Sequence, residues 1–295
     1  MTDRLKGCGT ALVTPFTKDG SLDEPALRKL VDWQIEQGIH FLVPCGSTGE
    51  AATMTPAEHR RVVEITVEQA KGRVPIVAGA GSNDTAKAVA LSREMQAAGA
   101  THLLHVSPMY NKPPQRGIIE HFQKIADATD LPIIVYNVPG RTGSNIEAKT
   151  TLSLARIPNI VAVKEASGNL GQITDILRER PDHLSVLSGD DELTLAVMAA
   201  GGDGVISVVS NATPKAMSQL CEVASRGDFA AARKLHFQLL AWMRAAFVES
   251  NPIPVKAAMA MLGKMENRLR LPLVPLSDAH TETVRTALRT AGVLG

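Results

Sequence analysis

The sequence predicts a (β/α)8 barrel, the TIM-barrel class of α/β fold, followed by a helical C-terminal extension. Three observations lead to this prediction. Eight short apolar runs, rich in β-branched residues and bounded by Gly, Pro or Asn, recur along the chain, as is typical of parallel strands buried on both faces. Segments with helical spacing lie between them. The runs end about every 28 residues, which fits one strand, one helix and two loops.

An open doubly wound sheet is the competing fold. It usually has fewer strands and a glycine-rich phosphate turn near its start. The glycine-containing segment 79–83 lacks the Lys-Ser/Thr ending of a P-loop. The number and spacing of the units therefore favour the closed barrel.

Each expected strand corresponds to one apolar run. In chain order the strands cover residues 10–14, 39–43, 75–78, 102–106, 132–136, 160–164, 184–188 and 204–208. Hydrophobic residues make up 44% of the 295 positions, which is enough to bury a large core.

Helices are expected between these strands and beyond the last one. The first, 23–37, has apolar residues at helical spacing and Asp23 as a possible N-cap. The second begins at Thr55, with Pro56 in its first turn and Glu58 completing a capping box. The others cover 84–98, 115–129, a segment starting at 145, 172–180, 191–200, 214–225, 228–247, 254–262 and 278–291.

This pattern divides the chain into two parts. Residues 1–212 are expected to form the barrel with the catalytic site. Residues 213–295, which are almost entirely helical in pattern, are expected to pack on the barrel as a C-terminal extension.

The composition excludes several classes of protein. Lys and Arg total 31 and Asp and Glu total 30, a net charge of +1, which argues against nucleic acid as the main partner. No apolar stretch is long enough for a transmembrane helix and none at the N-terminus resembles a signal peptide, so we expect a cytoplasmic protein without a membrane partner. Cys8, Cys45 and Cys221 have the spacing of neither a disulfide framework nor a CxxC metal site.

Lys164 is the most informative candidate for catalysis. It ends an otherwise apolar strand, and active sites of such barrels form at the C-terminal ends of the strands. Burial lowers the pKa of a lysine because its charged form loses water. A neutral amine can attack a carbonyl and form a Schiff base. The alternative is a structural lysine paired with Glu165 or Asp190.

Hydroxyl and cationic groups are expected at the same mouth. Tyr136, Tyr110 and Ser47 fall at predicted strand ends, where hydroxyls can relay protons without adding a competing charge. The segment 46–49 can offer backbone N–H groups to a carboxylate, and Arg141, in a tight loop, suits bidentate carboxylate recognition. Each of these positions also has an ordinary structural explanation.

A metal site is not expected. Asp190 and Asp191 are adjacent, but Asp191 is placed to cap the following helix and no further carboxylates or histidines complete a site for a hard cation. The eight histidines show no HxxxH spacing.

Seven motifs together identify a family. The chain resembles the dihydrodipicolinate synthase family, within the pyruvate-dependent class I aldolases, over nearly its whole length. The motifs are GTALVTPF at 9–16, GSTGE at 46–50, YNVPGRTG at 136–143, VKEASG at 163–168, SGDD at 188–191, GGDGVIS at 201–207 and ESNPIPVK at 249–256.

The resemblance implies a role for each catalytic candidate. Lys164 is the Schiff-base nucleophile and Tyr136 the proton relay beside it. Ser47 stands where the synthases usually have threonine, in a hydroxyl triad with Tyr136 and Tyr110. Tyr110 comes from the partner subunit across a tight dimer interface. The family assembles as a homotetramer of two such dimers.

The resemblance also implies the substrates and how they are held. Thr48 binds the pyruvate carboxylate, largely through its backbone N–H, and the region of Ile206 lines the pyruvate pocket. Arg141 binds the carboxylate of aspartate semialdehyde. Condensation of the two substrates gives 4-hydroxy-tetrahydrodipicolinate, on the route to diaminopimelate and lysine. Neither a metal nor an organic cofactor is required.

Two departures from the synthase pattern leave alternatives open. Serine at position 47 is frequent in sugar-acid lyases and other 2-oxo-acid aldolases of the family, so a related aldolase acting on a sugar acid or hydroxy-oxo acid is one alternative. A non-catalytic 2-oxo-acid-binding protein is another.

In synthases sensitive to lysine, the feedback site has a carboxylate at the position of Lys87 and an aromatic residue at that of Met109, whereas Asn83 and His59 match. A cation at position 87 repels lysine, so weak inhibition is expected.

Overall fold

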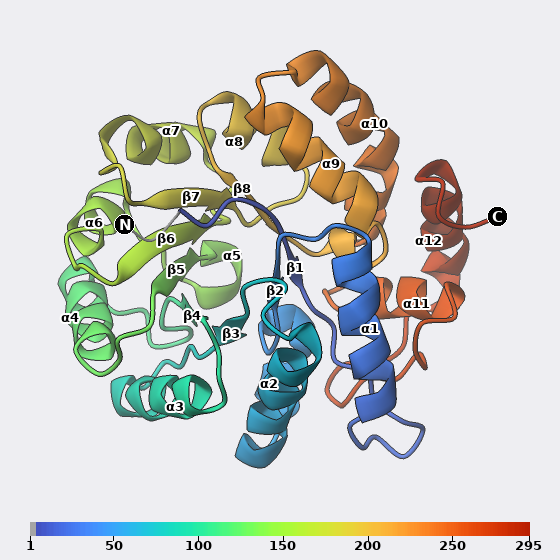
Figure 1. Cartoon of the computed structure of the whole chain (residues 1–295), viewed down its shortest axis with the longest axis horizontal. Coiled ribbons are helices and arrows are strands. Elements are labelled where there is room, and N and C mark those ends of the chain that lie inside the picture. Colours follow the sequence, from blue (N-terminus) through green and yellow to red (C-terminus); the bar gives the residue numbers. More distant parts are fainter. Residues whose placement is uncertain (1–3) are drawn as a thin grey trace.

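The computed structural model describes residues 4–295, which form eight parallel strands in one sheet, in the order β2-β1-β8-β7-β6-β5-β4-β3. A parallel bridge between Leu42 and Ile76 links the two outer strands, so the sheet closes into a barrel. Helices surround the strands (Figure 1). The predicted (β/α)8 class is confirmed.

The eight strands lie close to their expected positions. They are β1 (Gly7–Ala11), β2 (Phe41–Val43), β3 (Val77–Gly79), β4 (His102–Val106), β5 (Ile133–Asn137), β6 (Ile160–Glu165), β7 (Ser185–Ser188) and β8 (Gly204–Ser207). The helices between β1 and β8 are α1 (Glu24–Glu36), α2 (Pro56–Ala70), α3 (Thr85–Ala97), α4 (Gln115–Ala126), α5 (Pro139–Thr142), α6 (Ala148–Leu154), α7 (Leu170–Glu179) and α8 (Thr194–Ala199).

Strand β1 begins three residues before the expected start at residue 10. Its register with β8 runs from Gly7 to Thr10, so the glycine-containing segment is part of the ladder. A Cβ on Gly9 would lie 1.9 Å from the ring of Phe41. Glycine at this position therefore lets the Phe41 ring fill the barrel interior, although glycine is a poor strand former elsewhere.

Three helix starts also differ from the expectation. The capping box of α2 is present, with the Thr55 side chain accepting from the Glu58 N–H. However, α6 begins at Ala148 and α8 at Thr194, each three residues late, and α7 begins at Leu170, two residues early. The loop expected around Arg141 contains the short helix α5.

Apolar side chains of the strands alternate between two layers. One layer packs against the surrounding helices. The other fills the barrel interior and includes Phe41, Leu104, Ile134, Tyr136 and Ile206. Because a parallel strand points alternate residues to opposite faces, this alternation decides which strand-end side chains face the barrel axis.

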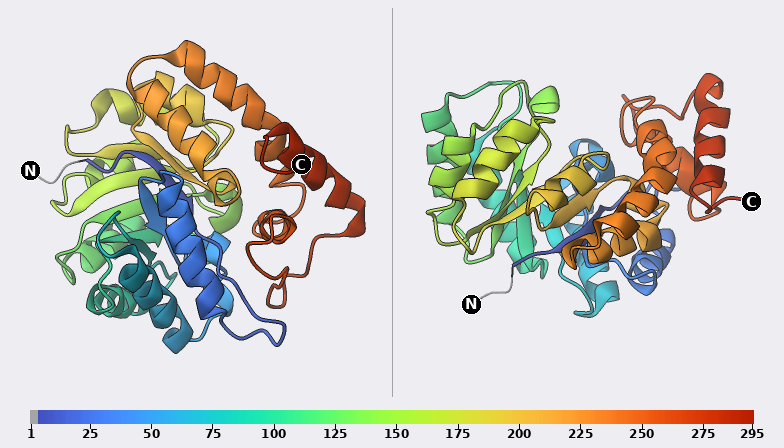
Figure 2. Two further views of the ribbon diagram at one scale, coloured as in Figure 1. Left: turned by 45° about the vertical axis from the view of Figure 1, so that its right-hand side comes forward. Right: turned by 90° about the horizontal axis from the view of Figure 1, so that it is seen from above.

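Helices follow the last strand. They are α9 (Pro214–Ser225), α10 (Phe229–Ala245), α11 (Ile253–Met261) and α12 (Asp278–Thr290). Helix α9 packs on β1 and α10, and α12 packs on α10 and α11. Figure 2 shows α11 and α12 standing at one side of the barrel. The division of the chain at residue 212 stays a prediction. None of the helices within residues 4–295 is long and apolar enough to cross a membrane.

Candidate active site

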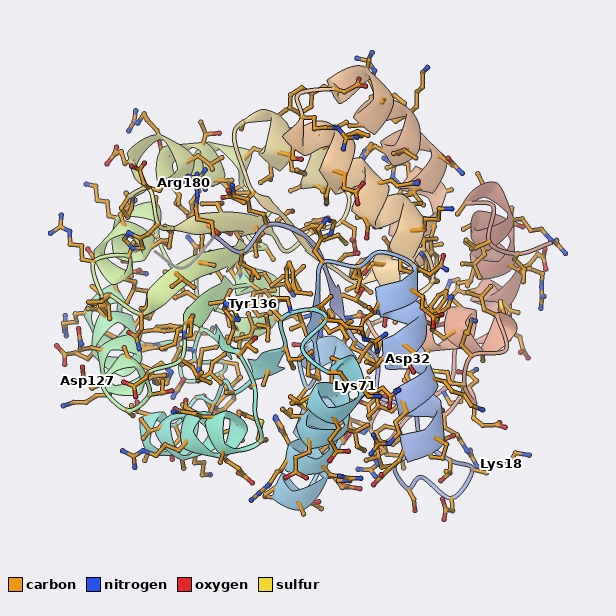
Figure 3. All side chains as sticks on the ribbon, viewed as in Figure 1. Lys18, Asp32, Lys71, Asp127, Tyr136 and Arg180 are labelled. Atoms are coloured by element: carbon orange, nitrogen blue, oxygen red, sulfur yellow. The ribbon has the colours of Figure 1, made fainter. Side chains whose placement is uncertain are left out.

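Lys164 ends β6 inside the barrel, next to Tyr136 on β5. The two residues are direct partners in the β5–β6 register, and Figure 3 shows Tyr136 among the strands near the centre of the molecule. The Lys164 amine lies 4.1 Å from the centre of the Tyr136 ring. Lys164 is only 5% exposed. Burial is the main cause that lowers its pKa to about 7, with Arg141 also lowering it and Asp191 opposing the shift.

Glu165 faces the opposite side of the strand. Its carboxylate accepts hydrogen bonds from Asn137 Nδ2 at 3.0 and 3.1 Å and from the Ser167 N–H at 2.7 Å. The Gln172 amide donates to the same carboxylate at 3.2 Å. None of the ion pairs formed by residues 4–295 includes Lys164. The alternative of a structural lysine paired with Glu165 is therefore wrong, because strand alternation separates the two side chains.

Gly189 makes the space for the Lys164 side chain. A Cβ at this position would lie 3.1 Å from Lys164 Cγ, 3.2 Å from its Cε and 2.7 Å from the Cβ of Ala166. Glycine is thus required here by close approach rather than by backbone conformation. The sequence contained this glycine in the SGDD motif, but gave no sign of its contact with Lys164.

The Tyr136 hydroxyl is protonated at neutral pH. Burial raises its pKa to about 12, and the nearby Arg141 charge opposes this only in part. When a neutral amine has added to a carbonyl carbon, the former carbonyl oxygen must leave as water. A protonated phenol beside the amine can donate the proton that this step needs. This pair can therefore serve carbonyl chemistry at the barrel mouth.

Asp191 has a different role from the expected helix cap. Its Oδ2 accepts from the N–H groups of Val208 at 3.0 Å and Val209 at 3.2 Å, which lie in the turn after β8. Asp190 accepts from the Glu192 N–H at 3.0 Å, and α8 begins only at Thr194. The cap assignment is wrong because two peptide N–H groups of another loop bind the carboxylate. Burial raises the pKa of Asp191 to about 6.

The candidate metal ligands do not converge. Among residues 4–295, no three His, Cys, Asp or Glu side chains form a group that could hold a metal ion. The three cysteines are buried and unbonded.

The GSTG segment forms a short 3-10 turn, Ser47–Gly49, directly after β2. The first N–H groups of such a turn have no partner within it, so those of Ser47 and Thr48 point to its open end. The turn is fixed from two sides, because Thr14 Oγ1 donates to the Gly49 carbonyl at 2.8 Å and Asn251 Nδ2 donates to Thr48 Oγ1 at 2.9 Å. Thr48 is buried. Ser47 is exposed.

Arg141 and Ile206 lie at the mouth as expected. Arg141 is in α5, and its Nη2 donates to the Asn251 carbonyl at 3.3 Å. Its charge acts on both Lys164 and Tyr136. Ile206 belongs to the interior layer that contains Tyr136.

Tyr110 lies apart from the buried pair. Its side chain is 88% exposed and its φ is +72°, an uncommon conformation for a bulky residue. The loop is held there because the Tyr110 N–H donates to the Thr142 carbonyl at 3.1 Å and Asn83 Nδ2 donates to the Met109 carbonyl at 3.1 Å. Within one protomer, the structure thus brings Lys164 and Tyr136 together but leaves the Tyr110 phenol in solvent.

The C-terminal extension supplies contacts that were not predicted. Lys256 of α11 is fully buried, and its amine donates to Glu50 Oε1 at 2.6 Å and to the Thr14 carbonyl at 2.9 Å. The other oxygen of Glu50 accepts from the Arg270 N–H at 3.1 Å. This ion pair and the Asn251 contacts connect the extension to the GSTGE segment. The ESNPIPVK motif contains both residues, but no pattern linked them to residues 200 positions earlier.

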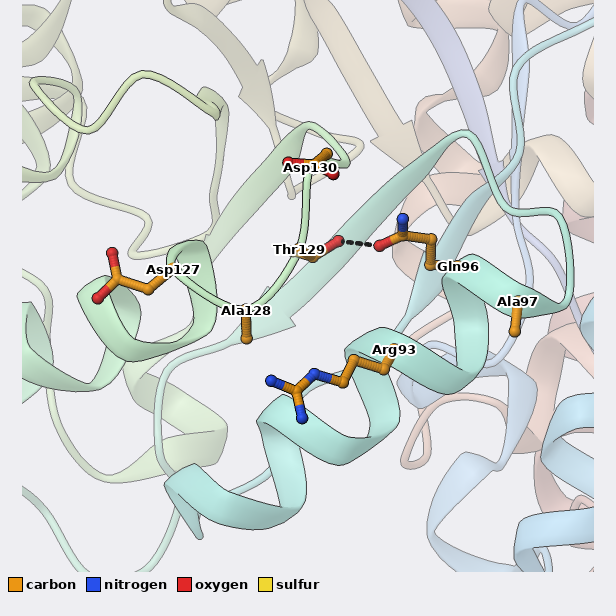
Figure 4. A pocket seen from close by; sticks show the side chains of 7 residues that line it. All are labelled: Arg93, Gln96, Ala97, Asp127, Ala128, Thr129 and Asp130. Atoms are coloured by element: carbon orange, nitrogen blue, oxygen red, sulfur yellow. Dashed lines mark hydrogen bonds between the residues drawn. The ribbon is translucent and has the colours of Figure 1, made fainter.

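A separate cavity lies away from this mouth. It has a volume of about 620 Å³ and opens between the end of α3 and the loop before β5, next to the hydrogen bond from Thr129 to Gln96 (Figure 4). Its lining mixes Arg93 with Asp127 and Asp130. Because this is the N-terminal end of the strands, it is the face associated with stability rather than catalysis.

Comparisons with known proteins show which family the chain is similar to. The model of the dihydrodipicolinate synthetase family matches residues 4–291. The 4-hydroxy-tetrahydrodipicolinate synthases of Koribacter versatilis and Maridesulfovibrio salexigens are 54% and 51% identical; the alignments cover 99% and 98% of this chain and 97% and 99% of theirs.

Solved structures give the same result. The dihydrodipicolinate synthase of Aquifex aeolicus is 42% identical with a TM-score of 0.96, over 98% of this chain and 99% of that one. The chloride-inhibited enzyme of Acinetobacter baumannii, complexed with pyruvate, is 43% identical with the same score and coverage.

Proposed function

The chain belongs to the dihydrodipicolinate synthetase family, and from this we propose that it condenses pyruvate with aspartate semialdehyde to give 4-hydroxy-tetrahydrodipicolinate, a step toward diaminopimelate and lysine. The observation that carries this proposal is the buried amine of Lys164 beside the Tyr136 phenol. The sugar-acid aldolase alternative is not favoured, because the relatives at about 50% identity are synthases.

The first half of the reaction uses Lys164 and Tyr136. The neutral amine attacks C2 of pyruvate, and the carbinolamine loses its hydroxyl as water with a proton supplied through Tyr136. The resulting iminium draws electrons from the methyl carbon, which loses a proton to give an enamine. The N–H groups at the open end of the GSTG turn and the Thr48 hydroxyl hold the pyruvate carboxylate.

The second half uses Arg141. Its guanidinium binds the carboxylate of aspartate semialdehyde, and the enamine carbon attacks the aldehyde to form the new C–C bond. The amine of the former semialdehyde then attacks the iminium carbon and displaces the Lys164 amine, which closes the ring. The iminium that Lys164 forms with pyruvate serves as the electron sink, so the proposed reaction needs no metal or organic cofactor.

Tyr110 serves the site of a partner subunit in this proposal. Its exposed phenol and strained backbone suit a side chain presented to another molecule. There it joins Ser47 and Tyr136 as a proton relay. We propose a homotetramer built from two tight dimers, in the cytoplasm where pyruvate is available. One related structure is of a monomeric dihydrodipicolinate synthase variant.

The pH dependence of pyruvate capture should follow the pKa of Lys164, about 7. Only the neutral amine attacks, so kcat/KM for pyruvate should rise about tenfold per pH unit below the pKa and level off above it. A pH series at saturating aspartate semialdehyde measures this. A rate that keeps rising toward pH 10, as for an ordinary lysine, would contradict the assignment.

Replacing Tyr136 with Phe should remove the relay and keep the ring. We expect kcat to fall by roughly 10²- to 10⁴-fold, the usual contribution of a positioned acid or base. The thermal midpoint should change little because the ring still packs beside Lys164. Turnover within twofold of the parent enzyme would exclude the relay role.

Lysine should inhibit the enzyme weakly. Lys87 is exposed on α3, and its charge repels a cationic effector approaching Asn83. Steady-state rates with added lysine measure this, and the Lys87→Glu variant, which restores a carboxylate, should be more sensitive. Strong inhibition of the parent enzyme by sub-millimolar lysine would refute the prediction.

An acceptor comparison tests the proposed function. Product formation from pyruvate with aspartate semialdehyde should exceed that with sugar aldehydes and simple hydroxyaldehydes at equal concentration. A clear preference for a sugar aldehyde would replace the proposed acceptor.

A further inference from the structure

Each of the two residues proposed for the chemistry is followed by a polar residue on the other face of its strand. Tyr136 and Lys164 are direct partners in the β5–β6 register, and so are Asn137 and Glu165, one position further along. Because successive residues of a strand point to opposite faces, the second pair lies on the helix-facing side of the sheet. Strands β5 and β6 end at this second pair.

Side-chain hydrogen bonds join the two strand ends. Asn137 Nδ2 donates to Glu165 Oε1 at 3.1 Å and to Oε2 at 3.0 Å, and both residues are almost fully buried. The main chain adds a bond from the Ala166 N–H to the Asn137 carbonyl at 2.8 Å. The side-chain bonds therefore reinforce the ladder where it ends, one residue past the Tyr136–Lys164 pair.

Neutral groups of neighbouring segments complete this network. The Ser167 N–H and Gln172 Nε2, on α7, donate to the Glu165 carboxylate at 2.7 and 3.2 Å. The Ile146 N–H, in the loop before α6, donates to Asn137 Oδ1 at 2.9 Å. Among residues 4–295 no cation forms an ion pair with this carboxylate. A buried charge that depends wholly on neutral donors is costly to place, so the network tolerates few other arrangements.

We propose that the Asn137–Glu165–Gln172 network positions the residues of the proposed chemistry from behind the sheet. By fixing the ends of β5 and β6, it sets the placement of the Lys164 amine against the Tyr136 phenol. This inference rests on the proposed function. The network acts through the backbone, because the strands themselves separate it from the barrel interior. A displacement of about 1 Å at a reacting group can cost roughly 100-fold in rate, so a small loosening of the strand ends is enough.

The pH profile separates an effect of position from an effect of charge. Burial is the main cause of the low pKa of Lys164, and the charges that modify it are those of Asp191 and Arg141, not that of Glu165. If the strand ends loosen, water reaches the amine and its pKa rises toward the ordinary value. Loss of a negative charge acting directly on the amine would instead lower that pKa, because such a charge favours the ammonium form.

Glu165→Gln is the main test, because it keeps the size of the side chain and replaces one acceptor oxygen with a donor. We expect kcat to fall roughly ten- to hundredfold. The KM for aspartate semialdehyde should stay within about threefold, since Arg141 is untouched. The midpoint of the pH profile of kcat/KM for pyruvate should move to higher pH. An unmoved midpoint, a midpoint at lower pH, or a kcat within about twofold of the parent would overturn the proposal.

Combining Asn137→Asp with Glu165→Gln tests the pairing itself. In Asn137→Asp alone, two carboxylates face each other across the strand ends, and this repulsion should disturb the network strongly. The double variant exchanges the amide and the carboxylate between the strands, so one donor again faces one acceptor. It should recover part of kcat and of the pH midpoint relative to Asn137→Asp. Absence of any recovery would contradict a coupled pair.

Gln172→Ala keeps the proposal testable if the buried variants do not fold. It removes one donor at the edge of the network and leaves the contact between Asn137 and Glu165 in place. We expect kcat to fall about two- to tenfold, with the pH midpoint moved in the same direction as in Glu165→Gln. Kinetic constants and a midpoint equal to those of the parent would refute the role of the network.

The matched control lies at the other end of the barrel. The Thr129 hydroxyl is also largely buried and donates to Gln96 Oε1 at 2.6 Å (Figure 4). Thr129→Val should lower the thermal midpoint and leave kcat and the pH profile unchanged. If the parent enzyme does not turn over pyruvate and aspartate semialdehyde, the proposed function fails. If the parent is active and Glu165→Gln behaves like Thr129→Val, only the present inference fails.

Discussion

Replacing Lys256 with Met should lower the free energy of unfolding by about 3–5 kcal/mol, the usual cost of leaving one member of a buried ion pair without its partner. Lys256 and Glu50 are both fully buried, with 2.6 Å between amine and carboxylate. Burial outweighs the attraction of Glu50 and lowers the pKa of Lys256 to about 8. Burial therefore disfavours both charges, and each is stabilised by the other. In the Lys256→Met variant, the Glu50 carboxylate would remain buried without its cationic partner. Urea unfolding at fixed protein concentration measures the change.

The double variant Lys256→Met with Glu50→Gln tests the reason for that loss. Removing both charges should recover much of the stability, because no uncompensated charge remains. If the double variant is as unstable as the two single changes added together, the ion pair is not the cause.

Replacing Lys164 with Met should abolish catalysis rather than stability. Turnover should fall by about 10⁴-fold or more because the covalent route is lost. Stability should be equal or higher, since Lys164 is buried and forms no ion pair within the described part of the chain, and a neutral side chain of similar length removes a desolvation cost. Kinetics and urea unfolding of the same preparation give both values. A large loss of stability would mean that Lys164 is structural.

The two lysine variants serve as controls for each other. Both are buried near the barrel mouth and both have lowered pKa values. Of the two, only Lys256 has a carboxylate partner among residues 4–295. The account therefore expects Lys256→Met to affect mainly folding and Lys164→Met to affect mainly chemistry.

Local pattern was sufficient to predict the barrel and the position of Lys164. An apolar run that ends in lysine places the amine at the carboxyl end of a buried strand, and strand alternation separates Lys164 from Glu165. The start of β1 was placed too late because Gly7 and Gly9 look like loop residues. Their role depends on the rings of His40, beside Gly7, and Phe41, beside Gly9, which are more than 30 positions away.

Contacts between distant segments could not be predicted from local pattern. Asn251 and Lys256 reach Thr48 and Glu50 across about 200 residues, and nothing in the spacing of either segment requires this pairing. Asp191 was assigned to the nearest helix, whereas peptide groups of the turn after β8 bind it. The role proposed for Tyr110 involves a second molecule, so the contacts within one protomer do not test it.

Reductive trapping tests the central claim most directly, namely that the Lys164 amine bonds covalently to C2 of a keto acid. Borohydride added in the presence of pyruvate should convert the imine to a stable secondary amine, and peptide mass mapping should place it on the peptide containing Lys164. The Lys164→Met variant should show no such adduct. An unmodified Lys164 peptide, or an adduct found on Lys256 instead, would contradict the account.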